Sequence, residues 1–184
     1  PDSMKKKGIL KHDTAVVTVM TNLGFFHFAE REGTKTAATK VGDRYVLEEM
    51  LDKDYNIGGE QSGHIIFLDH ATTGDGQLSG AKTIETLVNS GKKMSELAGI
   101  METFPQLMLN VRIKPEHRNI WREDPAVKSC MESYEEKLGS NGRILVRESG
   151  TEPLIRVMVE GKDAALMEEA CRMITAEIEA FVNR

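Results

Sequence analysis

In the first half of the chain, segments with the apolar pattern of a strand alternate with segments that have the apolar spacing of a helix. The run Thr14–Val19 is almost continuously apolar, which is typical of a strand that is buried on both faces. Thr34–Thr39 and His64–Leu68 predict two further strands. Helical spacing separates these runs, with helices predicted over 22–32, from Asp43 onward and over 81–90. Strands that alternate with helices predict an α/β domain with a mixed sheet, which we place at residues 1–99.

Two polar residues mark expected helix starts in this half. Asn22 is expected to cap the first helix, and Asp43 to cap the second. The second helix is expected to bury one apolar face, formed by Val46, Leu47, Met50 and Leu51.

The order of predicted strands and helices differs in the second half of the chain, which follows an interruption of the pattern between Gly99 and Leu107. Leu109–Lys114 alternates as a half-buried strand, and Asp124 begins a helix that Gly139 ends. Strands are predicted over 143–147 and 155–159, followed by a helix capped by Asp163. The apolar stripe of this last helix is Leu166, Ala170, Met173, Ile174, Ile178 and Phe181. The order β-α-β-β-α predicts a small α+β domain over residues 100–184, with an antiparallel sheet packed on helices.

Composition and charge narrow the possible classes of protein. Apolar residues make up 40% of the chain and charged residues 29%, which is an ordinary globular balance. The net charge of −5 disfavours a nucleic-acid or anionic-membrane partner, and no run of about 18 apolar residues predicts a membrane span. Cys130 and Cys171 lie in helical patterns, so we expect free thiols and a cytoplasmic location. The chain opens at Pro1 without an initiator Met, and we expect it to be part of a longer protein.

The strongest candidate site is the segment Arg147–Arg156. Two arginines bracket a turn that contains Ser149, Gly150 and Thr151. Guanidinium groups, hydroxyls and backbone N–H groups at a glycine turn supply the converging donors that a phosphate needs. The alternative is a hairpin whose arginines are solvated or paired with the neighbouring Glu148 and Glu152.

The second candidate is the loop Gly58–His64. Its Glu60 and Ser62 offer a carboxylate and a hydroxyl, which suit neighbouring sugar hydroxyls or an amine beside a hydroxyl. The alternative is a plain loop between strands.

A third candidate lies at the start of a helix, at Gly42, Asp43 and Arg44, near Lys40. Such a position can face an anion, although Asp43 is more simply a helix cap.

Metal and nucleophile sites are not predicted. The five histidines are scattered without ligand spacing. Asp75 stands in the run Thr72–Gly76, which has too few acidic positions for a calcium loop and is interpreted as a turn.

Taken together and in this order, four motifs resemble the α-D-phosphohexomutase superfamily, and within it the family of bacterial phosphoglucosamine mutases. The matching segments are Thr39–Tyr45, Gly58–His64, Thr72–Gly76 and Arg147–Pro153, the last leading into Ile155–Glu160. The resemblance covers nearly the whole chain and implies most of domain 3 and all of domain 4 of a four-domain enzyme.

The resemblance also assigns roles to residues. The sugar-binding loop of the family maps onto Glu60, Ser62 and His64, and Gly42, Asp43 and Arg44 border the same cleft. The phosphate-binding loop maps onto the residues Arg147, Ser149, Gly150, Thr151 and Arg156. A hinge at Gly99–Pro105 would let the two loops close around a ligand.

The implied reaction interconverts glucosamine 6-phosphate and glucosamine 1-phosphate through a phosphoserine enzyme and a glucosamine 1,6-bisphosphate intermediate. The family's phosphoserine and its Asp-x-Asp-x-Asp loop for Mg²⁺ belong to domains 1 and 2. Neither occurs in these 184 residues. We therefore expect no catalytic or metal-binding residue in this chain, which alone should be inactive. The expected partners are a small sugar phosphate and the missing N-terminal domains, and a homodimer of the whole protein stays open.

Two alternatives remain. One is a phosphomannomutase or phosphoglucomutase of the same superfamily, although Gln61 and the form Gly150-Thr151-Glu152 favour the glucosamine enzyme. The other is a phosphate-binding module that has no catalytic half.

Overall fold

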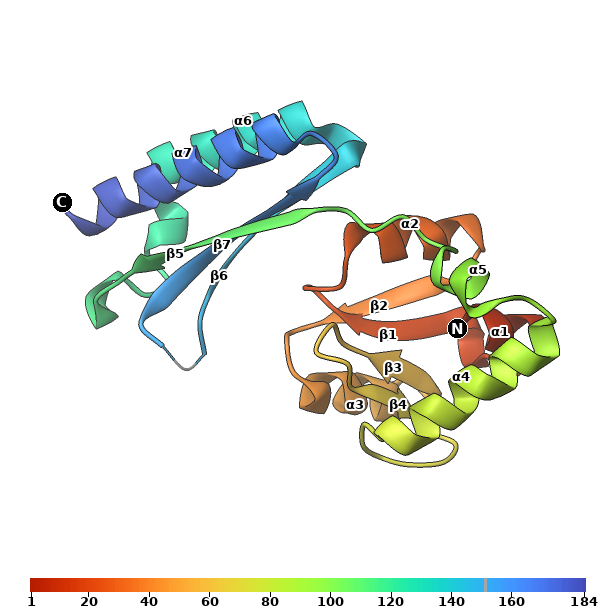
Figure 1. Cartoon of the computed structure of the whole chain (residues 1–184). Coiled ribbons are helices and arrows are strands. Elements are labelled where there is room, and N and C mark those ends of the chain that lie inside the picture. The colour runs from red at the N-terminus through yellow and green to blue at the C-terminus, as the bar shows by residue number, and fades with distance from the viewer. Residues whose placement is uncertain (151) are drawn as a thin grey trace. The chain divides into compact units, whose positions relative to one another are not determined.

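The computed structural model describes residues 1–150 and 152–184 and divides into two compact units (Figure 1). The first unit is Pro1–Thr103 and the second is Phe104–Arg184. The domain boundary expected from the sequence, after residue 99, lies a few residues before this division. None of the helices in these described ranges is long and apolar enough to cross a membrane.

A mixed sheet forms the centre of the first unit, in the strand order β2-β1-β3-β4. Its central strand β1 pairs in parallel with β2 and β3, and β4 pairs antiparallel with β3. The bounds are Thr14–Thr18 for β1, Lys35–Thr39 for β2, Ile57–Gly59 for β3 and Ile65–Phe67 for β4. The α/β domain with a mixed sheet is therefore confirmed.

Apolar side chains cover both faces of this sheet. Val16 of β1 packs with Val46 and Met50 of α3 on one face, whereas Ala15 packs with Leu10 and Ile57 in a second cluster. Because neighbouring residues of a strand point to opposite faces, all five residues of β1 are buried in this position. The helices are α1 (Asp2–Lys6), α2 (Leu23–Arg31), α3 (Asp43–Asp52), α4 (Gly76–Ser90) and α5 (Met94–Ala98), with a 3-10 turn at Lys11–Asp13.

Two helix starts in the first unit differ from the sequence-based prediction. Helix α3 has Gly42 at its N-cap, and Asp43 is already its first residue. Helix α4 begins at Gly76 rather than near residue 81, because the Asp75 carboxylate caps it by accepting a 2.9 Å hydrogen bond from the Leu78 N–H. The predicted apolar face of α3 was wrong at Leu51, which is 59% exposed.

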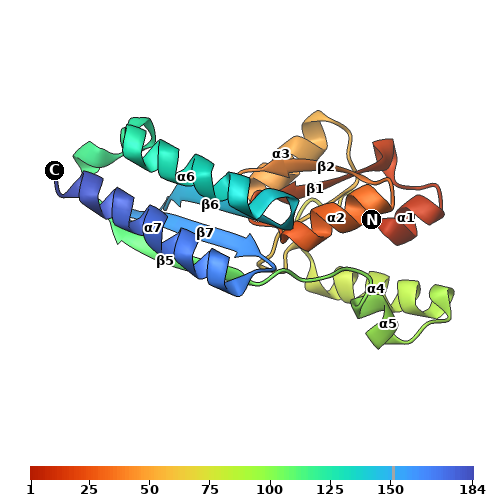
Figure 2. The ribbon, with the colours of Figure 1, turned by 90° about the horizontal axis from the view of Figure 1, so that it is seen from above.

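The second unit is a three-stranded antiparallel sheet in the order β5-β7-β6. Two helices, α6 and α7, lie side by side over one face of it (Figure 2). The strands are β5 (Gln106–Arg112), β6 (Gly142–Glu148) and β7 (Leu154–Gly161), and the helices are α6 (Pro125–Leu138) and α7 (Ala164–Val182). Short 3-10 turns occupy Pro115–His117, Trp121–Glu123 and Gly139–Asn141. The α+β architecture is confirmed.

The predicted caps of the second unit are present. Asp124 accepts from the N–H groups of Ala126 and Val127, and Asp163 from that of Leu166. The stripe predicted for α7 contains one error, Met173, which is 45% exposed. The fully buried positions of α7 are Met167, Ala170, Cys171, Ile174 and Ile178. Cys130 and Cys171 are both free thiols.

Candidate functional site

The carboxylate of Glu60 gathers three donors from two segments of the first unit. Its Oε1 accepts from the Ser62 hydroxyl at 2.7 Å and lies 3.3 Å from the His64 Nδ1. Its Oε2 accepts from the backbone N–H of Gly42 at 3.1 Å. The predicted sugar-loop residues Glu60, Ser62 and His64 therefore form one cluster, and Gly42 joins it.

This cluster stabilises the ionised form of the Glu60 carboxylate. Burial raises the pKa of the Glu60 carboxyl, but hydrogen bonds from Ser62, His64 and Gly42 outweigh burial, and the pKa lies below its ordinary value. The carboxylate is therefore ionised at neutral pH. Its side chain is only 10% exposed, whereas the His64 side chain is 55% exposed. The ionised Glu60 carboxylate thus lies behind two exposed side chains, Ser62 and His64. A negatively charged acceptor in this position suits the hydroxyl groups or an ammonium group of a ligand.

A short hairpin positions Glu60. Strand β3 ends at Gly59, β4 begins at Ile65, and the Glu60 N–H donates to the His64 carbonyl at 3.0 Å to close the loop. Gly58 serves the packing of β3 rather than the loop. A Cβ at this glycine would lie 2.5 Å from Val46 Cγ1, so the strand can only approach α3 with glycine there.

The three residues at the start of α3 do not act together. Gly42 has a φ of 130°, which residues other than glycine rarely adopt. This backbone conformation directs the Gly42 N–H toward the carboxylate of Glu60. Asp43 accepts a bond from the Arg44 N–H, and the Arg44 guanidinium pairs with Glu48 on the exposed face of the helix at 2.7 Å. Of the predicted cleft-lining residues, only Gly42 contacts the Glu60 cluster.

An apolar hollow of about 280 Å³ lies behind the same loop, and no pattern in the sequence indicated it. Ala15 and Val17 of β1 line it together with Phe25 of α2. Glu60 and Gln61 form part of its wall.

In the second unit, two arginines stand directly opposite each other. Arg147 of β6 and Arg156 of β7 are paired in register, close to the turn that joins the two strands. Arg156 donates to the buried Ser149 hydroxyl at 3.4 Å and pairs with Glu152 at 3.1 Å. Within the described ranges, the buried Nε of Arg147 has no hydrogen-bond partner.

This arrangement leaves positive charge uncompensated. Burial, followed by the neighbouring charge of Arg156, lowers the pKa of Arg147. A buried guanidinium N–H without an acceptor beside a like charge is costly, and a bound anion removes both costs. The geometry therefore favours an anion beside the side chains of Arg147 and Arg156, near the turn that joins β6 and β7.

The alternative pairing of the arginines with Glu148 and Glu152 holds only for Glu152. Glu148 turns to another segment and accepts from the Trp121 indole N–H at 3.0 Å and the Asn119 N–H at 2.8 Å. Trp121 and Asn119 thereby anchor the end of β6, a supporting role that sequence reasoning missed. The only hint of it is that Trp121 is the chain's single tryptophan.

The tip of the turn is open. Gly150 is exposed, and nothing lies within 4 Å of the position a Cβ would take. Thr151, which the resemblance assigns to phosphate binding, lies outside the described residues. Among the residues that are described, no group of three His, Cys, Asp or Glu side chains could hold a metal ion.

Comparison with known families gives two matches along the chain. The model described as phosphoglucomutase/phosphomannomutase, alpha/beta/alpha domain III, matches residues 2–104. The model of the phosphoglucomutase/phosphomannomutase C-terminal domain matches residues 108–177.

Curated relatives carry a more specific name. A phosphoglucosamine mutase of Ruminiclostridium cellulolyticum is 49% identical over 180 residues, which are 98% of this chain and 40% of that protein. A phosphoglucosamine mutase of Bacillus pumilus is 49% identical over 176 residues, covering 96% of this chain and 39% of that protein. The chain thus spans about 40% of the length of these relatives.

Solved structures share the fold at low identity. The N-acetylphosphoglucosamine mutase of Aspergillus fumigatus, in complex with GlcNAc-6P and magnesium, aligns with a TM-score of 0.78 at 16% identity, covering 98% of this chain and 41% of that chain. A putative phosphomannomutase from Thermus thermophilus aligns with a TM-score of 0.55 at 20% identity, covering 100% of this chain and 40% of that chain.

Proposed function

Because the chain belongs to the phosphoglucomutase/phosphomannomutase family, we propose that it is the sugar- and phosphate-binding portion of a phosphoglucosamine mutase. The whole protein would interconvert glucosamine 6-phosphate and glucosamine 1-phosphate. The two binding loops divide this work, since one lies in each unit of the chain.

The observation that carries the proposal is the pair Arg147 and Arg156. Two guanidinium groups face each other across β6 and β7, and the Arg147 Nε is buried without an acceptor. A phosphate can accept from both arginines, from the Ser149 hydroxyl and from the open backbone near Gly150. The phosphate that is not reacting would be held here.

The Glu60 cluster supplies sugar recognition. An ionised carboxylate accepts from neighbouring hydroxyls of the ring, and it complements the protonated amine of glucosamine more strongly than a neutral hydroxyl. Ser62 and His64 both contact the same carboxylate oxygen of Glu60. Their side chains can reorient to donate hydrogen bonds to the sugar or to accept them from it. Gly42 holds the other oxygen, so the carboxylate keeps its direction while the ligand exchanges.

Chemistry in the whole protein would require groups outside this chain. We propose a phosphoserine, a glucosamine 1,6-bisphosphate intermediate and Mg²⁺, which would stabilise the charge of the transferring phosphoryl group. The described residues offer no ligand set for this ion, so the chain's own contribution is to bind and orient the sugar phosphate. Relatives of similar fold are known in complex with GlcNAc-6P and magnesium, or with glucose 1,6-bisphosphate. The two free cysteines suit a reducing cytoplasm.

A chimera tests the proposal directly. The N-terminal portion of the Ruminiclostridium cellulolyticum phosphoglucosamine mutase, joined to this chain in place of its own C-terminal part, should convert glucosamine 6-phosphate to glucosamine 1-phosphate. Arg156→Ala in the chimera should raise KM for the sugar phosphate, and Glu60→Gln should lower kcat/KM. A folded chimera that turns over only mannose or glucose phosphates would overturn the assignment to glucosamine, and one inactive on all of them would overturn the proposed function.

A further inference from the structure

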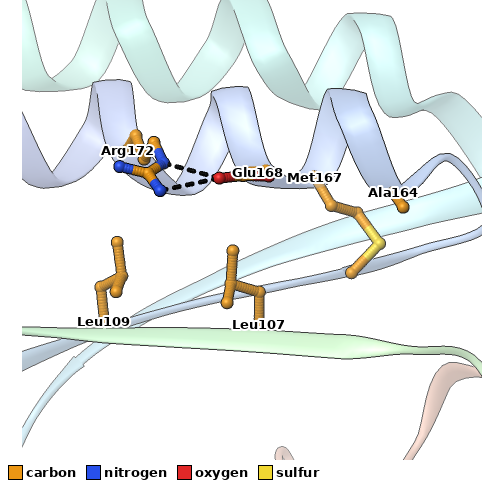
Figure 3. A pocket seen from close by; sticks show the side chains of 6 residues that line it. All are labelled: Leu107, Leu109, Ala164, Met167, Glu168 and Arg172. Carbon is orange, nitrogen blue, oxygen red and sulfur yellow. Dashed lines mark hydrogen bonds and ion pairs between the residues drawn. The ribbon is translucent and has the colours of Figure 1, made fainter.

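The two faces of the C-terminal sheet carry different side chains of β5. Leu107 and Leu109 point toward α7 and line a groove of about 420 Å³ beneath that helix (Figure 3). Val111, two positions further along, is buried in the same core. Because successive residues of a strand point to opposite faces, Arg112 lies on the face opposite the helices.

The register of the sheet brings three arginines together on that face. Arg147 of β6 and Arg156 of β7 are directly opposite each other, and Arg112 of β5 is directly opposite Leu154 of β7. Leu154 and Arg156 are two positions apart in one strand, so they share a face. Diagonal neighbours across two strands are within reach of long side chains. Arg112 and Arg147 therefore flank Arg156 on its two sides.

The pair Arg112–Leu154 is one of the pairs whose side chains lie close together. The Ile113 N–H donates to the Pro153 carbonyl at 3.0 Å, so the next pair of residues is the hydrogen-bonded one. Pairs that exchange no backbone bonds have the shorter separation in an antiparallel sheet. The stem of the Arg112 side chain is thus held against β7 beside the turn.

The Arg156 guanidinium is directed past Leu154 toward the same turn. It pairs with Glu152 at 3.1 Å and donates to the Ser149 hydroxyl at 3.4 Å. The Ser149 N–H donates to the Leu154 carbonyl, which places Ser149 on the side of Leu154 away from Arg112. The anion site around Ser149 and Arg156 therefore lies at the level of Arg112 along the strands.

Two of the three positive charges lack a negative partner. Glu152 compensates the charge of Arg156. The Arg112 side chain is exposed, and within the described ranges it forms no ion pair or hydrogen bond. Arg147 has no acidic partner among the described residues either, and its buried Nε lacks an acceptor. Two uncompensated charges match a phosphate monoester, which carries about −1.5 to −2 at neutral pH.

We propose that Arg112 is a third arginine of the phosphate site and makes this site selective for a dianion. The assignment rests on the proposed function, in which the phosphate of the sugar binds at this turn. Arg112 then contacts the phosphate from the edge strand, on the side of Arg156 away from Arg147. Glucosamine 6-phosphate and glucosamine 1-phosphate both present a dianionic monoester, so a site that recognises this charge accepts either isomer.

An exposed arginine on an edge strand also has a simpler role. Charged side chains there deter pairing with other strands, and β5 is an edge of its sheet. That role needs only an exposed charge and is independent of the neighbouring arginines. The two roles differ in a measurable property, because only an arginine in the phosphate site changes the affinity for anions according to their charge.

Amide NMR titrations of the 184-residue chain with methyl phosphate and with methanesulfonate test the assignment. The two ligands have similar tetrahedral ends, but at about pH 8 methyl phosphate is a dianion and methanesulfonate a monoanion. Arg112→Gln should raise the dissociation constant of methyl phosphate about fivefold, as expected for the loss of one exposed ion pair. It should raise that of methanesulfonate only about twofold, because the Coulomb energy is proportional to the charge of the ligand.

Two further variants serve as controls. Arg172→Gln removes another exposed arginine, which lies on α7 on the other side of the sheet and pairs with Glu168 (Figure 3). It should change neither dissociation constant. Arg112→Lys keeps the positive charge and should keep most of the preference for methyl phosphate.

The possible results separate this assignment from the proposed function. If Arg112→Gln changes both affinities by the same factor or not at all, or if Arg112→Lys is as weak as Arg112→Gln, the role of Arg112 is overturned. The phosphate site itself then stands, provided that Arg156→Ala still abolishes binding. If the unaltered chain binds neither ligand, or if methyl phosphate binding survives Arg156→Ala, the phosphate site and the role of Arg112 are both overturned.

Discussion

The backbone N–H of Gly42 donates a 3.1 Å hydrogen bond to the carboxylate of Glu60, 18 residues further along the chain. This bond ties the first turn of α3 to the β3–β4 hairpin. It fixes one carboxylate oxygen and leaves the other to Ser62 and His64. The orientation of the proposed sugar-binding group therefore depends on a backbone conformation at a distant glycine.

Gly42→Ala should destabilise the first unit and disturb Glu60. Alanine at a φ of 130° is strained by about 1–3 kcal/mol, and relief of the strain would move the N–H away from the carboxylate. Residue-resolved NMR during urea unfolding should show a lower free energy of unfolding for the first unit and altered shifts at Ser62 and His64.

Gly80→Ala is the matched control for that variant. Gly80 lies inside α4, with nothing within 4 Å of an added Cβ, so alanine should stabilise the helix by about 0.5–1 kcal/mol. If both alanine variants change stability equally, the conformation of Gly42 has no special role.

The stability of the first unit should depend on pH through Glu60. The pKa of this carboxyl is lower in the folded chain than its ordinary value of 4.5, so its contribution is present above pH 4.5 and is lost as the pH falls through the folded pKa. Glu60→Gln should therefore be less stable than the unaltered chain at pH 7, by about 1 kcal/mol. The difference between the two proteins should shrink as the pH falls from 4.5 through the folded pKa of Glu60, and a difference that stays constant with pH would contradict this account.

Glu148→Ala should weaken the second unit through Trp121. The substitution leaves a buried indole N–H without its acceptor, which costs about 1–3 kcal/mol. Since Trp121 is the only tryptophan, its fluorescence reports the unfolding of this unit directly. Glu152→Ala is the control, because its exposed pair with Arg156 contributes at most about 1 kcal/mol. Equal losses for the two variants would show that Glu148 is not an anchor.

Arg143→Met should be among the most damaging substitutions in the second unit. Glu160 is fully buried in β7, and Arg143 of β6 pairs with it at 2.7 Å. Removing the arginine takes a 2.7 Å ion-pair partner away from this buried carboxylate and should cost about 3 kcal/mol in urea unfolding. Lys128→Met removes an exposed ion pair with Glu123 and should change stability by less than about 1 kcal/mol. A loss for Arg143→Met as small as this control would contradict the role of the pair.

Local patterns predicted most of the fold correctly. The strands other than β3, and the caps at Asn22, Asp124 and Asp163, follow from hydrophobic spacing and from side chains that bond to nearby backbone groups. Strand β3 (Ile57–Gly59) was wrongly predicted as part of a loop, because Gly58 and Gly59 are typical loop residues. The start of α4 was predicted too late because Gly74, Asp75 and Gly76 look like a turn, and only the Asp75–Leu78 bond shows that Asp75 is a cap. Met173 was wrongly assigned to the core of α7, where Met167 and Cys171 are buried instead.

The candidate site was predictable in its residues and less so in its connections. The chemistry of Glu60, Ser62 and the two arginines can be inferred from residue types within short segments. The bond from Gly42 to Glu60 and the anchoring of Glu148 by Trp121 join segments far apart in the chain, and only tertiary structure brings them together. Arg44 illustrates the converse, since it lies near the site in sequence but pairs with Glu48.

The most direct test of the proposed function is an amide NMR titration of the chain with glucosamine 6-phosphate, with glucosamine and inorganic phosphate titrated separately. Phosphate should shift the amides of Arg147, Ser149 and Arg156, and glucosamine those around Glu60. Arg156→Ala should abolish the phosphate response, whereas Arg118→Ala, an exposed arginine outside the turn, should preserve it. Shifts at neither loop with millimolar glucosamine 6-phosphate, or a phosphate response that survives Arg156→Ala, would contradict the account.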